Sequence, residues 1–170
     1  MTDPLSIRYA DPEDAEQLVT LVNRLATESR FLVVDTIDPD TGPATVAEHL
    51  EAIQTSVLHV VLVAEVAERL VGIGLGAAEA HPAKRGSMRI DLGILSDWQR
   101  RGIGTQLMRG LEFAAKERGC HRLDLTVMVE NIPAMRLYQA CGFVFEGRLH
   151  RHLIINGEAV DQFLMAKMIG

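Results

Sequence analysis

A strand, a glycine-containing turn, a helix and a second strand follow one another between residues 87 and 130, and this succession constrains the fold most. Residues 87–95 alternate apolar and polar side chains, as a half-buried strand does. Residues 102–118 place Ile103, Leu107, Leu111 and Ala115 at four-residue steps, which is typical of a helix. Residues 121–130 alternate again. A unit of this kind needs a sheet with a helix packed on it.

The rest of the chain supplies further strands and helices. Strands are predicted at residues 6–10, 57–66, 70–78, 143–155 and 158–168, and helices after Asp11, at 45–54 and at 131–141. The short turns at 67–69 and at Asn156-Gly157 favour hairpins. The order β α α β β β α β α β β predicts an α/β (α+β) fold, a mixed sheet of about seven strands with helices on both faces. We expect residues 1–170 to form a single domain.

The composition narrows the range of partners and compartments. Lys and Arg number 17 against 23 Asp and Glu, a net charge of −6, which argues against a broad nucleic-acid interface. Cys120 and Cys141 are too few for a disulfide framework and are interpreted as reduced thiols. The acidic N-terminus does not resemble a signal peptide, and Glu65 ends the apolar run at 60–64. We therefore expect a cytoplasmic protein that meets neither nucleic acid nor membrane.

The turn between the strand at 87–95 and the following helix carries the densest chemical signal. It reads Gln99-Arg100-Arg101-Gly102-Ile103-Gly104, and its glycines let the backbone approach a ligand closely. The first N–H groups of the helix lack partners within it, so the turn is suited to bind phosphate. It is not a P-loop, because no Gly-Lys-Ser/Thr follows, and Leu107 replaces the third glycine of a dinucleotide-binding turn. The simpler alternative is a helix start with packing glycines and solvated arginines.

Two motifs together resemble those of the GCN5-related N-acetyltransferases (GNAT). The turn matches the family's Q/R-x-x-G-x-G/A pattern, and Asn131-x-x-Ala134-x-x-Leu137-Tyr138-x-x-x-Gly142-Phe143 matches its second motif. By the order of elements the resemblance covers essentially the whole chain. It implies the GNAT fold and transfer of an acetyl group from acetyl-CoA to a primary amine by direct attack in a ternary complex, with no metal.

The resemblance also implies roles for individual residues. The family's turn and strand end hold the pyrophosphate and pantetheine of acetyl-CoA, and the matching residues here are Ile94, Gln99, Arg100, Arg101, Gly102, Ile103, Gly104 and Thr105. The family's asparagine bonds pantetheine, which implies that role for Asn131, and its tyrosine is the general acid, which implies that role for Tyr138. On one helix these two would face the same way, about 10 Å apart. Alternatively, Asn131 only caps the helix and Tyr138 fills the edge of the core.

No single residue stands out as the general base. Many family members carry a Glu or His on the substrate-facing side of the fourth strand, at positions that align with Met88 and Ile90, and neither side chain can take a proton. Asp91 lies on the opposite face by alternation, where it fits a cross-strand charge pattern. The remaining candidates are Glu79 and His81 at the end of the preceding strand, and Glu28 after the first helix. A chain of water molecules to solvent is equally compatible.

The acceptor stays open between small-molecule and peptide amines, and so does the length of the acyl group. We expect the acceptor to meet residues 28–45, which include Asp35, Asp38 and Asp40, and the last two strands. Met88 and Ile90 in place of an acid favour a rival function, a non-catalytic acyl-CoA-binding or sensing module. The resemblance allows a homodimer, since dimers are common in the family. His150 and His152 share a strand face but lack further metal ligands, so no metal site is predicted.

Overall fold

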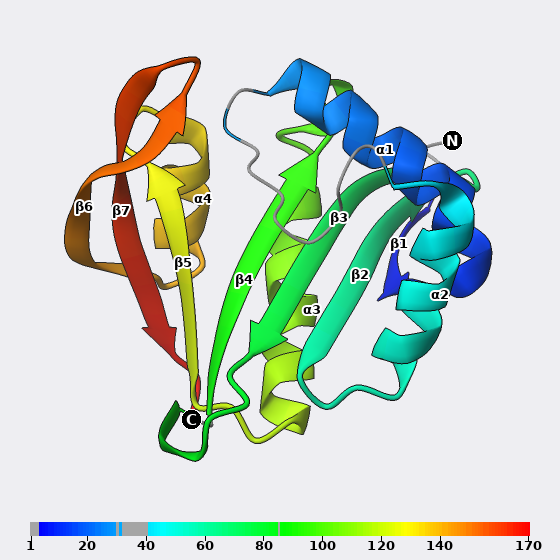
Figure 1. The fold of residues 1–170 in the computed structure, drawn as a ribbon, viewed down its shortest axis with the longest axis horizontal. Helices are drawn as coiled ribbons and strands as arrows, with labels where there is room; N and C mark the ends of the chain where they lie inside the picture. Colours follow the sequence, from blue (N-terminus) through cyan, green and yellow to red (C-terminus); the bar gives the residue numbers. More distant parts are fainter. Residues whose placement is uncertain (1–3, 30, 32–40, 85) are drawn as a thin grey trace.

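The computed structural model describes residues 4–29, 31, 41–84 and 86–170 and contains a seven-stranded sheet (Figure 1). The strands are β1 (Leu5–Tyr9), β2 (His59–Val66), β3 (Arg69–Ala78), β4 (Ser87–Ile94), β5 (Arg122–Met128), β6 (Val144–Ile155) and β7 (Glu158–Met168). The helices are α1 (Ala15–Glu28), α2 (Pro43–Gln54), α3 (Ile103–Glu117) and α4 (Ile132–Ala140), with short 3-10 turns η1 (Pro12–Asp14), η2 (Pro82–Lys84) and η3 (Ser96–Trp98).

This order confirms the predicted one, and the element ends differ from the predicted ends by only one or two residues. Most of the loop predicted at 35–43, with Asp35, Asp38 and Asp40, lies outside the described residues. Cys120 and Cys141 are free thiols, as predicted. None of the helices described combines the length and apolarity needed to cross a bilayer.

The sheet is mixed, as predicted, with strand order β1-β2-β3-β4-β5-β7-β6. Every neighbouring pair is antiparallel except β4 and β5, which are parallel and are joined through α3. Two hairpin turns have left-handed backbones at both central positions, Ala67-Glu68 and Asn156-Gly157. Such turns match the twist of the strands they join, which is why the Asn-Gly pair predicted its hairpin correctly.

Helices cover both faces of the sheet, and each face has its own core. One cluster buries α3 and α4 against residues such as Met88 and Ile90, while the other buries α1 and α2 against residues such as Ile73 and Leu75. A Cβ at Gly74 would lie 3.3 Å from Leu111 of α3. Because Gly74 has no side chain, α3 can sit close to β3, which confirms that a strand glycine here permits a close approach.

Pairing along β4 is unequal on its two sides. Its register with β3 runs from Gly72↔Ile94 to Ala78↔Met88, whereas its register with β5 stops at Arg89↔Asp124. In Figure 1 the green β4 and the yellow β5 lie together at their lower ends and draw apart toward their upper ends. The C-terminal half of β4 therefore has backbone groups that β5 does not bond.

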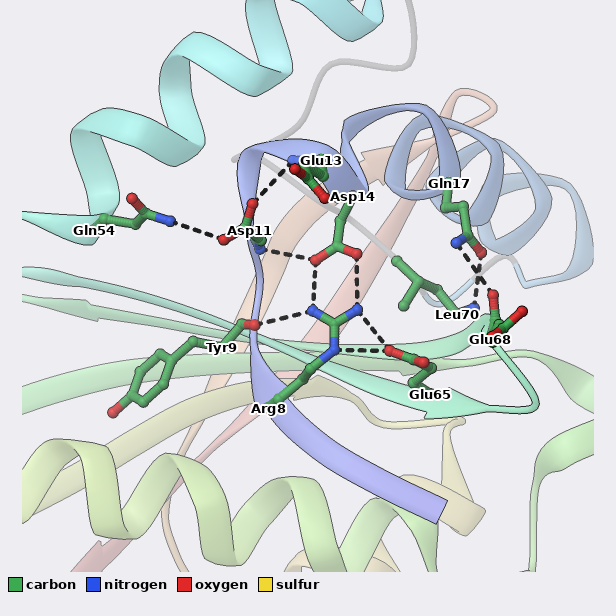
Figure 2. Close-up of polar contacts among 10 residues, drawn as sticks. All are labelled: Arg8, Tyr9, Asp11, Glu13, Asp14, Gln17, Gln54, Glu65, Glu68 and Leu70. Atoms are coloured by element: carbon green, nitrogen blue, oxygen red, sulfur yellow. Dashed lines mark hydrogen bonds and ion pairs between the residues drawn. The ribbon is translucent and has the colours of Figure 1, made fainter. Parts of the chain in front are cut away.

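A polar network around Arg8 stabilises the edge of the sheet that is formed by β1 (Figure 2). The guanidinium donates to both oxygens of Asp14 at 2.7 and 2.8 Å and, through Nε, to Glu65 of β2 at 2.7 Å. Asp14 also accepts the N–H of Asp11 at 2.8 Å. The Arg8 guanidinium lowers the pKa of the Asp14 carboxyl, which is only 6% exposed. The network therefore ties the start of α1 to the first two strands.

Candidate active site

The turn after β4 leaves backbone N–H groups without helical partners at the start of α3. Gly102 precedes the helix with a φ of 80°, and a Cβ there would meet nothing within 4 Å, so the backbone angle and not space favours glycine. The first N–H of α3 that reaches a helical carbonyl is that of Gln106, which donates to Gly102 at 3.1 Å. The N–H groups of Ile103, Gly104 and Thr105 precede it and have no helical carbonyl to bond, as at the helix termini that bind anions.

The second glycine of the turn brings the two sequence motifs into contact. A Cβ at Gly104 would lie 2.7 Å from Cδ2 of Leu137 on α4 and 3.3 Å from Cδ1 of Ile94 on β4. Because glycine leaves this space free, Leu137 of α4 reaches the first turn of α3, close to the end of β4. The predicted donor-binding turn and the predicted Asn131/Tyr138 helix therefore lie next to each other.

The polar side chains of the turn are arranged around the end of β4. Gln99 Nε2 donates to the carbonyl of Ile94 at 3.0 Å, so this side chain holds the backbone group that is predicted to meet pantetheine. The Arg101 guanidinium lies 4.7 Å from the centre of the Trp98 ring. Arg100 and Arg101 are exposed, and neither forms an ion pair with a carboxylate in the part of the chain described. Both charges are available to an anionic ligand.

Asn131 caps α4 and Tyr138 lies on it; this helix follows β5, the strand from which β4 draws apart. Asn131 Oδ1 accepts the N–H of Ala134 at 3.3 Å, so the predicted cap is present. Its NH2 group has no hydrogen-bond partner among the residues described. Tyr138 is 7% exposed, and burial first, then the charge of Asp91, raises the pKa of its hydroxyl above the ordinary value. Tyr138 therefore stays protonated throughout the physiological range.

Asp91 is the residue of this site that the sequence interpretation set aside. It pairs with Leu75, which packs on the α1 and α2 face, and it comes two residues after the last β4–β5 pair. Met88 and Ile90, taken as the substrate-facing positions, are instead buried beneath α3. Alternation had sorted these residues onto opposite faces correctly. The error was to take the face of Met88 and Ile90 as the one that meets substrate. The apolar character of these two residues could have indicated that their face is covered by a helix.

The structure does not bring the candidate bases Glu79 and His81 into this site. Both are exposed and lie beyond the far end of β3, where the N–H of Glu79 meets the carbonyl of Ser87. Ser87 is seven residues from Ile94 along β4, roughly 23 Å at about 3.3 Å per residue. The reason is the antiparallel pairing of β3 and β4. The connection between these strands lies at the end where β4 is still paired with β5, which is opposite to the end that holds Ile94. The structure therefore places neither residue at this site, and we do not retain them as bases.

Glu28 is also unsuited to be a base. One of its carboxylate oxygens accepts the N–H of Ser96 at 2.9 Å and the other accepts from Arg24 at 2.7 Å. These bonds, that of Ser96 first, lower the pKa of Glu28 below its ordinary value. These bonds stabilise the ionised carboxylate, so Glu28 is a weak proton acceptor.

The two histidines on β6 have structural partners. His150 Nδ1 lies 3.1 Å from Asp161, and His152 Nδ1 lies 2.6 Å from Gln162. Within the ranges described, no group of three metal-ligating side chains comes together.

Farther along α3, a cavity of about 230 Å³ shares Thr105 with the turn and is lined by Met108, Arg109, Glu112, Ala140, Cys141, Phe143 and Lys167.

Similar proteins of known sequence were found over part or most of the chain. The L-amino acid N-acetyltransferase AaaT of Escherichia coli K12 is 38% identical over 81 residues, 46% of this chain and 50% of its own length. An N-alpha-acetyltransferase of Sulfurisphaera tokodaii is 30% identical over 170 aligned positions, 94% of this chain and 90% of its own length. The chain thus spans half of the first relative and nearly all of the second.

Solved structures of the same fold were also found. An acetyltransferase of the GNAT family from Streptococcus pneumoniae has a TM-score of 0.89 and 30% identity, covering 98% of this chain and 100% of its own. The yncA protein of Salmonella typhimurium, solved with its cofactor acetyl-CoA, has a TM-score of 0.83 and 21% identity, covering 98% and 94%. The family model for the acetyltransferase (GNAT) family matches residues 25–143. The chain therefore belongs to the GNAT acetyltransferase family.

Proposed function

We propose that this protein is an N-acetyltransferase that moves an acetyl group from acetyl-CoA to a primary amine by direct attack in a ternary complex. One observation carries the proposal: β4 leaves β5 after Arg89, and at the end of the freed segment stands a helix terminus with unbonded N–H groups. Tyr138 is buried next to this parting, where it meets the charge of Asp91. A donor site and a proton donor are thereby close together.

The residues of the site fit acetyl-CoA, a ligand with phosphates at one end and a thioester at the other. The N–H groups of Ile103, Gly104 and Thr105 would hold the pyrophosphate, with Arg100 and Arg101 adding positive charge. The NH2 group of Asn131 and the backbone at Ile94 would hold the amide-containing arm. Acetyl-CoA supplies the activated acyl group, and no metal or covalent intermediate is required.

Tyr138 would act as the general acid of the reaction. A thiolate with a pKa of about 8.5 takes a proton readily when it leaves, and a tyrosine whose pKa is raised still carries one. Backbone N–H groups at the end of β4 would stabilise the oxyanion that forms before the thiolate departs. Asp91, on the face of the sheet opposite to α3, replaces Glu79 and His81 as the carboxylate that meets the amine and takes its proton.

The acceptor class follows from charge and from the relatives. A primary amine has a pKa of about 10 and arrives mostly as a cation, which a carboxylate such as Asp91 attracts. AaaT is named for L-amino acids and the Sulfurisphaera protein for N-alpha-acetylation. We therefore propose α-amino groups, of free amino acids or of peptide N-termini, as the first acceptors to test.

The test is release of CoA thiol from acetyl-CoA in the presence of a panel of amino acids, peptides and polyamines. We expect turnover with at least one α-amine and its loss with Tyr138→Phe. Calorimetry with acetyl-CoA runs beside it. Binding without turnover for any amine would identify a non-catalytic acyl-CoA-binding module, and absence of both would reject the donor site. Light scattering of the same sample tests whether the protein forms the homodimer that the resemblance allows.

A further inference from the structure

Glu28 joins two segments that lie 68 residues apart in the chain. It is the last residue of α1, and its Oε2 accepts the backbone N–H of Ser96 at 2.9 Å, while Oε1 accepts from Arg24 at 2.7 Å. Figure 1 shows the C-terminal end of α1 next to the arrowhead of β4, where Ser96 follows. Glu28 and Ser96 are both exposed, so the contact lies at the surface of the protein.

Ser96 is the residue from which the donor turn is built. It begins η3, and an N–H at the start of a helix has no partner inside it. The carbonyl of Ser96 then accepts the N–H of Gln99 at 3.2 Å, and Gln99 in turn bonds the carbonyl of Ile94. A displacement of Ser96 would therefore move Gln99, the first residue of the turn.

Trp98 carries the same displacement further. Its ring packs against both hydrophobic clusters, so it touches the layers on the two faces of the sheet. The guanidinium of Arg101 rests on that ring at 4.7 Å. Fixing η3 thus also fixes the ring on which the Arg101 guanidinium rests, one residue before Gly102.

We propose that Glu28 is a positioning residue for the donor: by bonding the N–H of Ser96 it holds η3, and through Gln99 and Trp98 the phosphate-binding turn, in the conformation that receives acetyl-CoA. This inference rests on the proposed function. It assigns Glu28 a part in donor binding through the protein backbone, without contact to either substrate. The end of α1 and the donor turn are then coupled at the C-terminal end of β4.

Three variants separate this role from a purely structural one. Glu28→Ala removes the acceptor of the Ser96 N–H, Glu28→Gln keeps an amide oxygen that can accept it, and Arg24→Gln removes the ion pair but leaves the Ser96 bond. We expect Glu28→Ala to raise both the Kd and the KM for acetyl-CoA about tenfold with kcat within about twofold, as loss of one charge-assisted hydrogen bond implies. Glu28→Gln should stay within about threefold of wild type, and Arg24→Gln within about twofold.

The outcomes distinguish this inference from the proposed function. If the wild type binds acetyl-CoA and Glu28→Ala binds it equally well, the positioning role is wrong while the proposed function stands. Equal weakening by Arg24→Gln and Glu28→Ala would also overturn the inference, because the ion pair would then be responsible. If the wild type does not bind acetyl-CoA, the proposed function fails and the inference fails with it. Recovery of affinity in Glu28→Gln is the supporting result.

Discussion

The two sides of β4 show how one strand serves both stability and function. Toward β3 its register is unbroken from Ala78↔Met88 to Gly72↔Ile94, and toward β5 it ends at Arg89↔Asp124. On the first side lies a framework of antiparallel strands, fastened at its edge by the Arg8 network. On the second side β5 does not bond the backbone of β4 beyond Arg89, and this is the segment that we propose for the donor. On this proposal, stability and ligand binding depend on different neighbours of the same strand.

The framework and the opening also differ in how fully their polar groups are used. Around Arg8, both oxygens of Asp14 and a carboxylate oxygen of Glu65 are bonded at 2.7–2.8 Å. Around the opening, by which we mean the space between β4 and β5 beyond Arg89, the polar groups are less used. Among the described residues the NH2 group of Asn131 has no hydrogen-bond partner, and Arg100 and Arg101 form no ion pair with a carboxylate. Substitutions in the two regions should therefore have separable effects.

The largest effect is expected for Tyr138→Phe. Loss of the general acid should lower kcat by about 100-fold or more, because proton transfer by a placed side chain contributes roughly that much. The Kd for acetyl-CoA should stay within about twofold, since the ring remains in the core. Steady-state kinetics and calorimetry measure the two quantities. The chain's other tyrosine is the matched control: Tyr9→Phe, at the framework edge, should leave kcat unchanged, and an equal loss in both variants would contradict the assignment.

The next effect concerns stability. Asp14→Asn should lower the free energy of unfolding by about 2–3 kcal/mol, because the Arg8 guanidinium loses a buried, charge-assisted partner. Denaturant unfolding measures this, and the Kd for acetyl-CoA should not change. Glu13→Gln, one residue earlier and exposed, is the control and should be nearly silent. Weakened donor binding in Asp14→Asn would show that framework and opening are not separable.

The same pair makes a prediction about pH. The pKa of Asp14 is lower in the folded state than its ordinary value, so its stabilising contribution is complete above the unfolded pKa of about 3.9. It is lost as the pH falls from there through the lowered folded value. The stability difference between wild type and Asp14→Asn should therefore be constant from about pH 7 to pH 5 and shrink below about pH 4. A stability difference that grows as the pH falls would contradict a lowered pKa of Asp14 in the folded state.

A smaller effect is expected where α3 meets α4. Gly104→Ala should push Leu137 away and raise the Kd for acetyl-CoA about fivefold, at a cost in stability of about 1 kcal/mol. Gly110→Ala is a control on the same helix, since its Cβ would meet Leu62 of the framework at 2.8 Å. It should cost similar stability and leave the Kd unchanged. Equal changes in Kd would mean that the space at Gly104 has no special relation to the donor.

The smallest effect is expected for Arg101→Gln. Removing one exposed cation and its contact with Trp98 should raise the Kd for acetyl-CoA about threefold, and the loss should fade at high salt. Arg69→Gln, an exposed arginine at the start of β3 on the framework side, is the control. Titrations at two salt concentrations distinguish the two. A salt-independent loss would argue against contact with phosphate.

Much of the fold could be predicted because its signals are local. The alternation of Ser87 to Ile94, the helical spacing from Ile103 to Ala115 and the Asn156-Gly157 turn each depend on nearby residues, and each prediction is confirmed. The contacts that hold the framework are not local: Arg8 meets Glu65 across 57 residues. Nothing in the neighbouring sequence of either residue indicates that pair.

The parts of the site that a sequence motif specifies could be predicted. The parts that depend on which face of the sheet a helix covers could not. The motif located the turn at Gly102 and the helix with Tyr138, and the structure brings both to the end of β4. Alternation shows that Asp91 and Met88 point to opposite faces but not which face α3 covers. That choice is made by packing, so Asp91 was set aside and Glu79 and His81 were preferred. The capping role of Glu28 toward Ser96 depends on a tertiary contact and left no local signal.

A crystal structure of the protein with acetyl-CoA tests the central claim most directly. The account predicts the pyrophosphate on the N–H groups of Ile103, Gly104 and Thr105, the pantetheine arm between β4 and β5 beyond Arg89, and the sulfur beside the Tyr138 hydroxyl. Acetyl-CoA bound away from the parting of these strands, or bound there with Tyr138 remote from the sulfur, would contradict it.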